Sequence, residues 1–185
     1  MRSRIAVSFG EKLALDLLVA EDAPAAAQAL VVAQDVNLIL GDVEPVVEAS
    51  GGSAEELVDE ASGFRPRRLG SVAVVRNKRG KAIVLQAIVY DFDRSPPARE
   101  EHVFEALMSA FEEARARALA RLAVRPIGTA HAGLAPASFL RLLVQVCYSS
   151  AELGTTVKRV FLLIPSPDEM EKYQTLLKGL VERLP

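Results

Sequence analysis

The sequence contains no tryptophan, only one cysteine, and aromatic residues at just 5% of its 185 positions. A single thiol excludes an internal disulfide framework, so we expect a reducing, cytoplasmic setting. Cys147 lies in the apolar run 142–147 with no basic residue beside it. We therefore interpret Cys147 as a buried structural thiol rather than as a nucleophile.

The chain also lacks an excess of charge of either sign. It has 22 Lys and Arg against 24 Asp and Glu, a net charge of −2, which argues against a nucleic-acid backbone as the main partner. Arg65, Arg67 and Arg68 lie close together and are interpreted as a solvated loop. No apolar run approaches the length of a membrane span, and no secretory signal pattern opens the chain, so we expect no membrane partner.

Sites for metals or cofactors have no visible signature, because no cysteine and histidine cluster has the spacing of metal ligands. Neither an internal repeat nor a linker divides the chain. Hydrophobic residues make up 50% and charged residues 25% of it. This composition predicts one globular domain over residues 1–185, with no metal and no cofactor.

Hydrophobic periodicity predicts strands first and then alternating helices and strands. The predicted strands are 4–9, 13–19, 29–33, 71–76, 81–90, 122–127 and 157–164. The predicted helices are 44–61, 98–120, 136–150 and a last helix that begins after an N-cap at Ser166 and runs to about residue 183. This order predicts an α/β fold, a three-layer α/β/α sandwich with a mixed central sheet covered by helices on both faces.

The segment from Gly128 to Ala135 is a loop of small residues between a strand and a helix. Small side chains let a ligand approach backbone N–H groups, and the following helix N-terminus favours an anion. A plain tight turn explains the same residues, and the pattern is neither a Walker loop nor a dinucleotide-binding glycine motif. If the loop binds phosphate, Gly133→Val is expected to remove binding and leave the fold intact, because the branch would fill the phosphate's space.

Three blocks of the sequence resemble the macro domain, a family that binds ADP-ribose. They are residues 27–38, residues 41–49, and the loop with Ile127, Thr129, Gly133 and the proline that follows. The resemblance implies a three-layer α/β/α fold and a site for ADP-ribose or a related nucleotide. It implies ligand contacts at the following positions: Glu21, Asp22, Asp35, Gly41, Val43, Gly128, Thr129, Ala130, His131, Ala132 and Gly133.

Several family positions are altered in this chain. Asp35 stands where the family has an asparagine that contacts the distal ribose, and Val32 replaces an earlier asparagine. The family's first glycine-rich loop is reduced to residues 38–41, with bulky Ile39 and Leu40 that crowd a diphosphate if they point into the site. Glu21 or Asp22 retains the acidic side chain that reads the adenine amino group.

Each candidate residue has a structural alternative. Asp35 is either a ribose ligand or general base, or a residue that caps the turn after its strand. Glu21 and Asp22 are adenine acceptors or members of a solvated turn. His131 donates to a phosphate or is an exposed loop residue without a role. His102, among charged residues at a helix start, is interpreted as a surface residue.

Three functions follow from the resemblance. The first is a binding module for ADP-ribose or a related nucleotide without clear catalytic residues. The second is an ADP-ribosyl hydrolase, acting on mono-ADP-ribose or O-acetyl-ADP-ribose, with Asp35 as its catalytic residue. The third is a macro-like domain that has lost its ligand and serves in protein assembly, as a homo-oligomer or through the apolar residues 38–40. Loss of the paired asparagines weighs against the hydrolase.

Overall fold

The computed structural model describes residues 6–20, 22–38, 40, 66–76 and 83–182, and its centre is one seven-stranded mixed sheet. The order of the strands is β1-β2-β7-β6-β3-β5-β4. Their bounds are β1 Ala6–Phe9, β2 Leu13–Val19, β3 Ala29–Asp35, β4 Val72–Arg76, β5 Ile83–Tyr90, β6 Arg121–Val124 and β7 Arg159–Ile164. The mixed sheet agrees with the fold class predicted from the periodicity.

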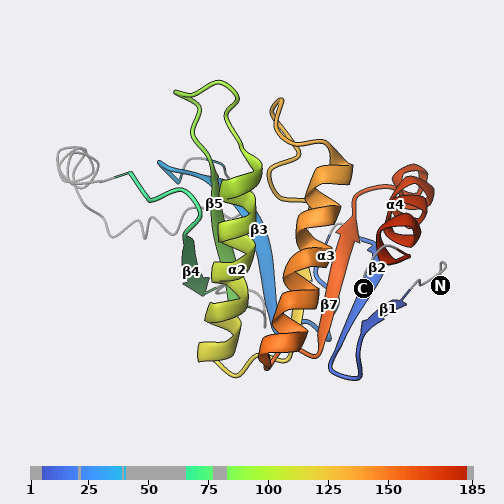
Figure 1. Ribbon diagram of the computed structural model, residues 1–185. Coiled ribbons are helices and arrows are strands. Elements are labelled where there is room, and N and C mark those ends of the chain that lie inside the picture. The colour runs from blue at the N-terminus through green and yellow to red at the C-terminus, as the bar shows by residue number, and fades with distance from the viewer. Residues whose placement is uncertain (1–5, 21, 39, 41–65, 77–82, 183–185) are drawn as a thin grey trace.

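Five of the strands, β2, β7, β6, β3 and β5, run parallel, and the antiparallel strands β1 and β4 form the two edges. The carboxyl ends of all five parallel strands therefore meet at one edge of the sheet. The loops after β5 and β6 project from this edge, which is the upper one in Figure 1. In open sheets of this kind, ligands bind at the carboxyl ends of the strands.

Three helices are described: α2 Glu100–Ala116, α3 Pro136–Leu153 and α4 Pro167–Val181. Helix α2 connects β5 to β6, α3 connects β6 to β7, and α4 follows β7. The predicted N-cap of α4 is present, because the Ser166 side chain accepts a hydrogen bond from the Glu169 N–H at 3.4 Å. Helix α2 ends four residues before the predicted boundary at Ala120. Ala118 takes a left-handed φ of 52°, and the Leu119 N–H donates to the Ala114 carbonyl at 2.8 Å, which is a Schellman ending.

All three described helices cover the same face of the sheet (Figure 1). Alternation along each strand explains this, since Leu122, Val160 and Leu162 pack under the helices. Ala123 and Phe161 face the other way, in a smaller cluster with the segment before β3. The predicted helix 44–61 lies outside the described residues. None of the described helices is both long and apolar enough to cross a lipid bilayer.

At the carboxyl edge of the sheet, two predicted strand ends were wrong. Strand β3 continues to Asp35, two residues past the predicted end, because β5 supplies ladder partners beyond Ala33 across a bulge between Gln34 and Asp35. Strand β6 ends at Val124 rather than at residue 127, because its ladder to β3 ends there and the chain turns into the loop. Both differences lie at the carboxyl edge, where the candidate site is found.

The core prediction concerns Leu107, which is fully buried between α2 and the sheet. Leu107→Ala should lower the free energy of unfolding by about 2–5 kcal/mol, because it leaves a cavity in a packed core. Glu112→Ala, at an exposed position of the same helix, should change it by less than about 0.5 kcal/mol. Urea denaturation measures the free energy of unfolding of both variants. An equal loss in Leu107→Ala and Glu112→Ala would contradict the described packing.

Candidate functional site

A cavity of about 260 Å³ opens at the carboxyl ends of β3, β5 and β6. Its walls combine apolar side chains with an arginine, a histidine and a backbone loop. The lining residues are Val32, Ala33, Leu40, Tyr90, Arg125, Pro126, Ala130 and His131. A concave, mostly apolar pocket with a few polar groups is the usual form of a small-molecule site.

Tyr90, the last residue of β5, holds the loop after β6 in place. Its hydroxyl accepts a hydrogen bond from the Ala130 N–H at 3.0 Å and donates to the Ala130 carbonyl at 3.1 Å. The residue is 1% exposed. Burial raises the pKa of the Tyr90 hydroxyl, outweighing the lowering by its hydrogen bond to the Ala130 backbone, so the proton stays available for donation. One side chain thus satisfies both polar groups of a residue in the loop.

The same loop contains a tight turn over residues 130–133. The Gly133 N–H donates to the Ala130 carbonyl at 2.9 Å, and His131 and Ala132 have φ values of 53° and 57°. A turn with two successive positive φ values and this hydrogen bond is of type I′. Glycine and asparagine favour that conformation, so a histidine and an alanine there carry backbone strain.

Backbone N–H groups remain available in this loop. Within the described part of the chain, the N–H groups of Thr129, His131 and Ala132 donate to no protein acceptor. Arg125 follows β6 and lines the cavity, as does His131 among these three residues. Backbone donors together with a guanidinium are the groups that bind phosphate and carboxylate oxygens.

A side chain at Gly133 would meet the backbone of its own loop, not the space of a ligand. A Cβ atom there would lie 2.1 Å from the Gly128 carbonyl oxygen and 2.9 Å from that of Ala130. The expectation that Gly133→Val leaves the fold intact is therefore wrong, because the added branch collides with backbone that must move. Gly128, at φ 75°, is equally restricted, since a Cβ atom would lie 2.5 Å from Val103 of α2.

Asp35 ends β3 and closes the second loop that borders the cavity. Its Oδ1 accepts from the Asn37 N–H at 2.7 Å and its Oδ2 from the Leu40 N–H at 2.7 Å. The residue is 2% exposed and does not line the cavity. Both carboxylate oxygens are thus used by the turn after the strand, which is the geometry of the capping alternative.

Gln34 supports the same loop from the neighbouring position. Its Nε2 donates to the Leu40 carbonyl at 2.9 Å, and its Oε1 accepts from the Leu40 N–H at 2.9 Å. Sequence reasoning missed Gln34, although a polar residue inside an otherwise apolar strand was the available signal. The consequence is that Leu40 is fixed against the core and forms part of the cavity wall.

Three aromatic rings meet at the mouth of the cavity. The rings of Tyr90 and Phe92 are stacked, with centroids 5.6 Å apart and an interplanar angle of 7°. His131 stands edge-on to both, at 5.5 Å from Tyr90 and 5.6 Å from Phe92. Phe92 remains 52% exposed and was not predicted as a site residue. This cluster holds His131 beside the cavity, where it stays exposed, and its contact with a ligand remains a prediction.

Of the other positions predicted to contact the ligand, some are described by the structure and some are not. Asp22 is exposed and follows β2 at the same carboxyl edge, but it does not line the cavity. Glu21, Ile39, Gly41 and Val43 lie outside the described residues. Among described residues, Phe92 and Leu153 are the exposed large hydrophobic side chains, whereas Leu38 and Leu40 are half-buried.

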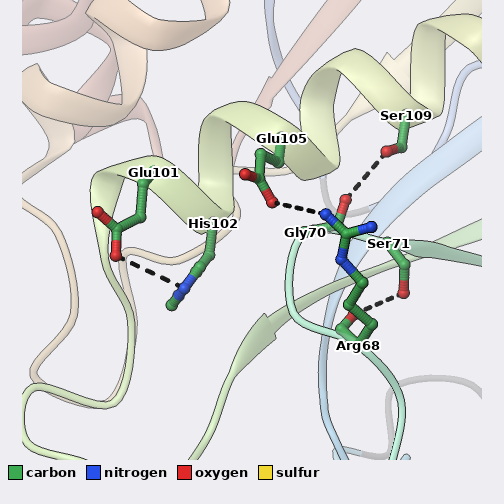
Figure 2. Close-up of polar contacts among 7 residues, drawn as sticks. All are labelled: Arg68, Gly70, Ser71, Glu101, His102, Glu105 and Ser109. Carbon is green, nitrogen blue, oxygen red and sulfur yellow. Dashed lines mark hydrogen bonds and ion pairs between the residues drawn. The ribbon is translucent and has the colours of Figure 1, made fainter.

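A larger groove of about 680 Å³ lies beside this cavity, between the segment before β4, the loop after β5 and the first turns of α2. Figure 2 shows α2 beside this groove: Arg68 Nη2 lies 3.8 Å from Glu105 Oε2 in the groove lining. One turn further along α2, the Ser109 hydroxyl donates to the Gly70 carbonyl. His102, which was interpreted as a surface residue, is half-buried in the wall of this groove, with its side chain 16% exposed. Its Nε2 lies 3.6 Å from Glu101 Oε1, which is too long for a hydrogen bond.

Groups for metal or thiol chemistry are not found in the described ranges. No cluster of three or more histidine, cysteine, aspartate or glutamate residues there has a metal-binding arrangement. Cys147 is fully buried, and burial raises the pKa of its thiol. A thiol in that state is a poor nucleophile, in agreement with the structural interpretation.

Comparison with known proteins gives a fold but no relative by sequence. No protein-family model matches the chain, and no curated protein matches it. The Oceanobacillus iheyensis macrodomain with ADP has a similar structure, with a TM-score of 0.75, 17% identity, and 98% of each chain covered. A mutant of that macrodomain with ADPR has a TM-score of 0.75 and 16% identity over 98% of this chain and 100% of that one.

More distant structures agree. The Trypanosoma brucei macrodomain in complex with ADP has a TM-score of 0.62 and 17% identity, over 88% of this chain and 68% of that one. The macro domain of ganglioside induced differentiation associated protein 2 has the same TM-score and identity, over 88% and 82%. This chain has the macrodomain fold, as the three sequence blocks predicted.

The steric position of Gly133 gives a prediction about stability. Gly133→Ala should lower the free energy of unfolding by more than about 1 kcal/mol, because a methyl group there requires the loop backbone to shift. Gly179→Ala is the matched control, since nothing lies within 4 Å of its Cβ position in α4, and it should raise stability by roughly 0.5–1 kcal/mol. Thermal unfolding measures the stability of both variants. A Gly133→Ala variant as stable as the parent protein would contradict the described loop.

Proposed function

We propose that this protein binds ADP-ribose or a related nucleotide at the carboxyl edge of its sheet, without catalysing a reaction on it. The observation that carries the proposal is the loop of residues 128–133, whose Ala130 and His131 line the cavity together with Arg125 and whose shape is fixed by the Tyr90 hydroxyl. Solved proteins of the same fold contain ADP or ADPR, which supports a ligand of this class.

In this proposal the diphosphate lies against the loop and Arg125. Backbone N–H groups held in advance bind an anion without the entropic cost of ordering, and the guanidinium adds a charge-assisted hydrogen bond. The apolar wall from Val32 and Leu40 excludes water on the opposite side. His131, which belongs to the loop, also lines the cavity and contributes a further donor.

The two ends of the ligand are assigned to opposite parts of the edge. Neighbouring strands are about 4.8 Å apart, so the three steps from β2 to β3 separate their ends by roughly 14 Å. Asp22 follows β2, and the cavity lies at the ends of β3, β5 and β6. We assign the base to the Asp22 side and a terminal ribose to the cavity, whose 260 Å³ suits part of a nucleotide rather than all of it.

Asp35 has a supporting role in this proposal. A general base needs a carboxylate oxygen that faces the reacting group. Both oxygens of Asp35 accept backbone N–H groups of the loop at 2.7 Å, and the residue is buried. The proposal therefore treats the protein as a binding module, with Asp35 and Gln34 shaping the pocket wall.

Calorimetric titration of ADP-ribose into the protein at neutral pH tests the proposal. We expect a dissociation constant in the micromolar range, about −8 kcal/mol. ADP should bind as well, since it shares the diphosphate, whereas adenosine should bind far more weakly. No heat at millimolar ADP-ribose would contradict the proposal.

The role of the Tyr90 hydroxyl gives a second prediction. Tyr90→Phe should weaken ADP-ribose binding about tenfold, ~1.4 kcal/mol, because the loop loses the bonds that fix it. The variant should keep its fold, since the ring still fills its site. Tyr148→Phe removes a hydroxyl from α3 and should leave affinity unchanged. Calorimetry measures the ADP-ribose affinity of both variants. Equal affinity in Tyr90→Phe and the parent protein would contradict the proposed phosphate loop.

A further inference from the structure

Another pocket lies on the helix-covered face of the molecule, at the end opposite the candidate nucleotide site. Its volume is about 260 Å³, and it is formed by the second half of α2 and the end of α3. These two helices lie side by side and end at the lower edge in Figure 1, away from the loops after β5 and β6. A partner bound in this pocket leaves the carboxyl edge of the sheet uncovered.

The pocket has an apolar lining and an open rim. Met108 and Phe111 of α2 line it, and Phe111 is buried. Leu153, the last residue of α3, also lines it and is 80% exposed, compared with 52% for Phe92. Beside Leu153, nothing lies within 4 Å of the position that a Cβ atom would take at Gly154. The pocket is therefore accessible, and an apolar side chain protrudes next to it.

Two side chains of opposite charge line the same pocket. Glu112 and Arg115 both belong to α2, and both are exposed. Within the described ranges neither of them has an ion pair or a side-chain hydrogen bond. Glu113 and Arg117 of the same helix, in contrast, pair with each other at 3.1 Å. The pocket lining thus offers a partner one acid and one base, and it has no net charge.

These features are complementary to a second copy of the same surface. In a contact with two-fold symmetry, residue i of one copy meets residue j of the other, and j meets i. This surface has both an apolar side chain that protrudes, Leu153, and an apolar pocket that could receive it. It also has both members of an ion pair, Glu112 and Arg115. A surface with charges of one sign would repel its own copy, whereas this one attracts it.

We propose that the chain forms a two-fold symmetric dimer through the ends of α2 and α3. Leu153 of each copy enters the pocket of the other copy, and Glu112 of each copy pairs with Arg115 of the other. Because the contact has one leucine and one ion pair per copy at its centre, the dimer is weak and its population depends on concentration. The dimer has two uncovered carboxyl edges, and it does not depend on the proposed nucleotide binding.

Sedimentation equilibrium of the full chain, over concentrations from micromolar to millimolar, tests the proposal. The chain should be a monomer at the lowest concentrations and reach twice that mass at the highest. Leu153→Gln should weaken dimerisation about tenfold or more, because a leucine side chain is no longer buried at either of the two symmetric contacts. Phe92→Gln, the matched change at the other exposed large hydrophobic side chain, should leave dimerisation unchanged.

Charge reversal tests the two-fold pairing itself. Glu112→Arg and Arg115→Glu each place like charges at both contacts, so each variant alone should dimerise about tenfold more weakly than the parent protein. An equimolar mixture of the two variants should recover dimerisation, because each contact between the unlike copies again joins opposite charges. Glu171→Arg, at an exposed position of α4, is the control and should dimerise like the parent.

Three results would overturn the proposed dimer. The first is a chain that stays monomeric at millimolar concentration. The second is a dimer that Leu153→Gln does not weaken, because such a dimer uses another surface. The third is a mixture of the two charge variants that associates no better than either variant alone. Calorimetry with ADP-ribose on Leu153→Gln should give the affinity of the parent protein, so the dimer and the proposed function are tested separately.

Discussion

The site depends on one hydroxyl group, that of Tyr90, which bonds to both polar atoms of Ala130 from 40 residues away. The loop of residues 128–133 is made of small side chains and has left-handed residues at His131 and Ala132. Small side chains provide little packing, so such a loop keeps a strained shape only where other contacts fix it. The hydroxyl, the edge-on ring of His131 and the close fit of Gly133 provide those contacts.

The other side of the cavity is fixed by charge and amide groups rather than by glycine. Gln34 and Asp35 at the end of β3 together bind the backbone of the following loop, which places Leu40 in the wall. The result is a pocket with one apolar side and one side of donors. This asymmetry suits a ligand that presents oxygen atoms to β6 and its loop, and a less polar surface to β3.

Sequence patterns predicted the strands, the helix caps and the small-residue loop because those depend on neighbouring residues. They did not predict Tyr90, because its partner is distant in the chain and a tyrosine at a strand end has many uses. They left Asp35 between two roles, since only the position of the Asn37 and Leu40 N–H groups decides which atoms its carboxylate meets. The direction of the missing Cβ at Gly133 likewise follows only from the folded loop.

The most direct test of the central claim is to follow backbone amide resonances while ADP-ribose is added to isotope-labelled protein. The account predicts that the largest shifts fall on residues 128–133 and on Leu40, with little change in the segment 152–155 at the opposite end of the sheet. Shifts confined to other regions, with residues 128–133 unchanged at saturating ADP-ribose, would contradict it.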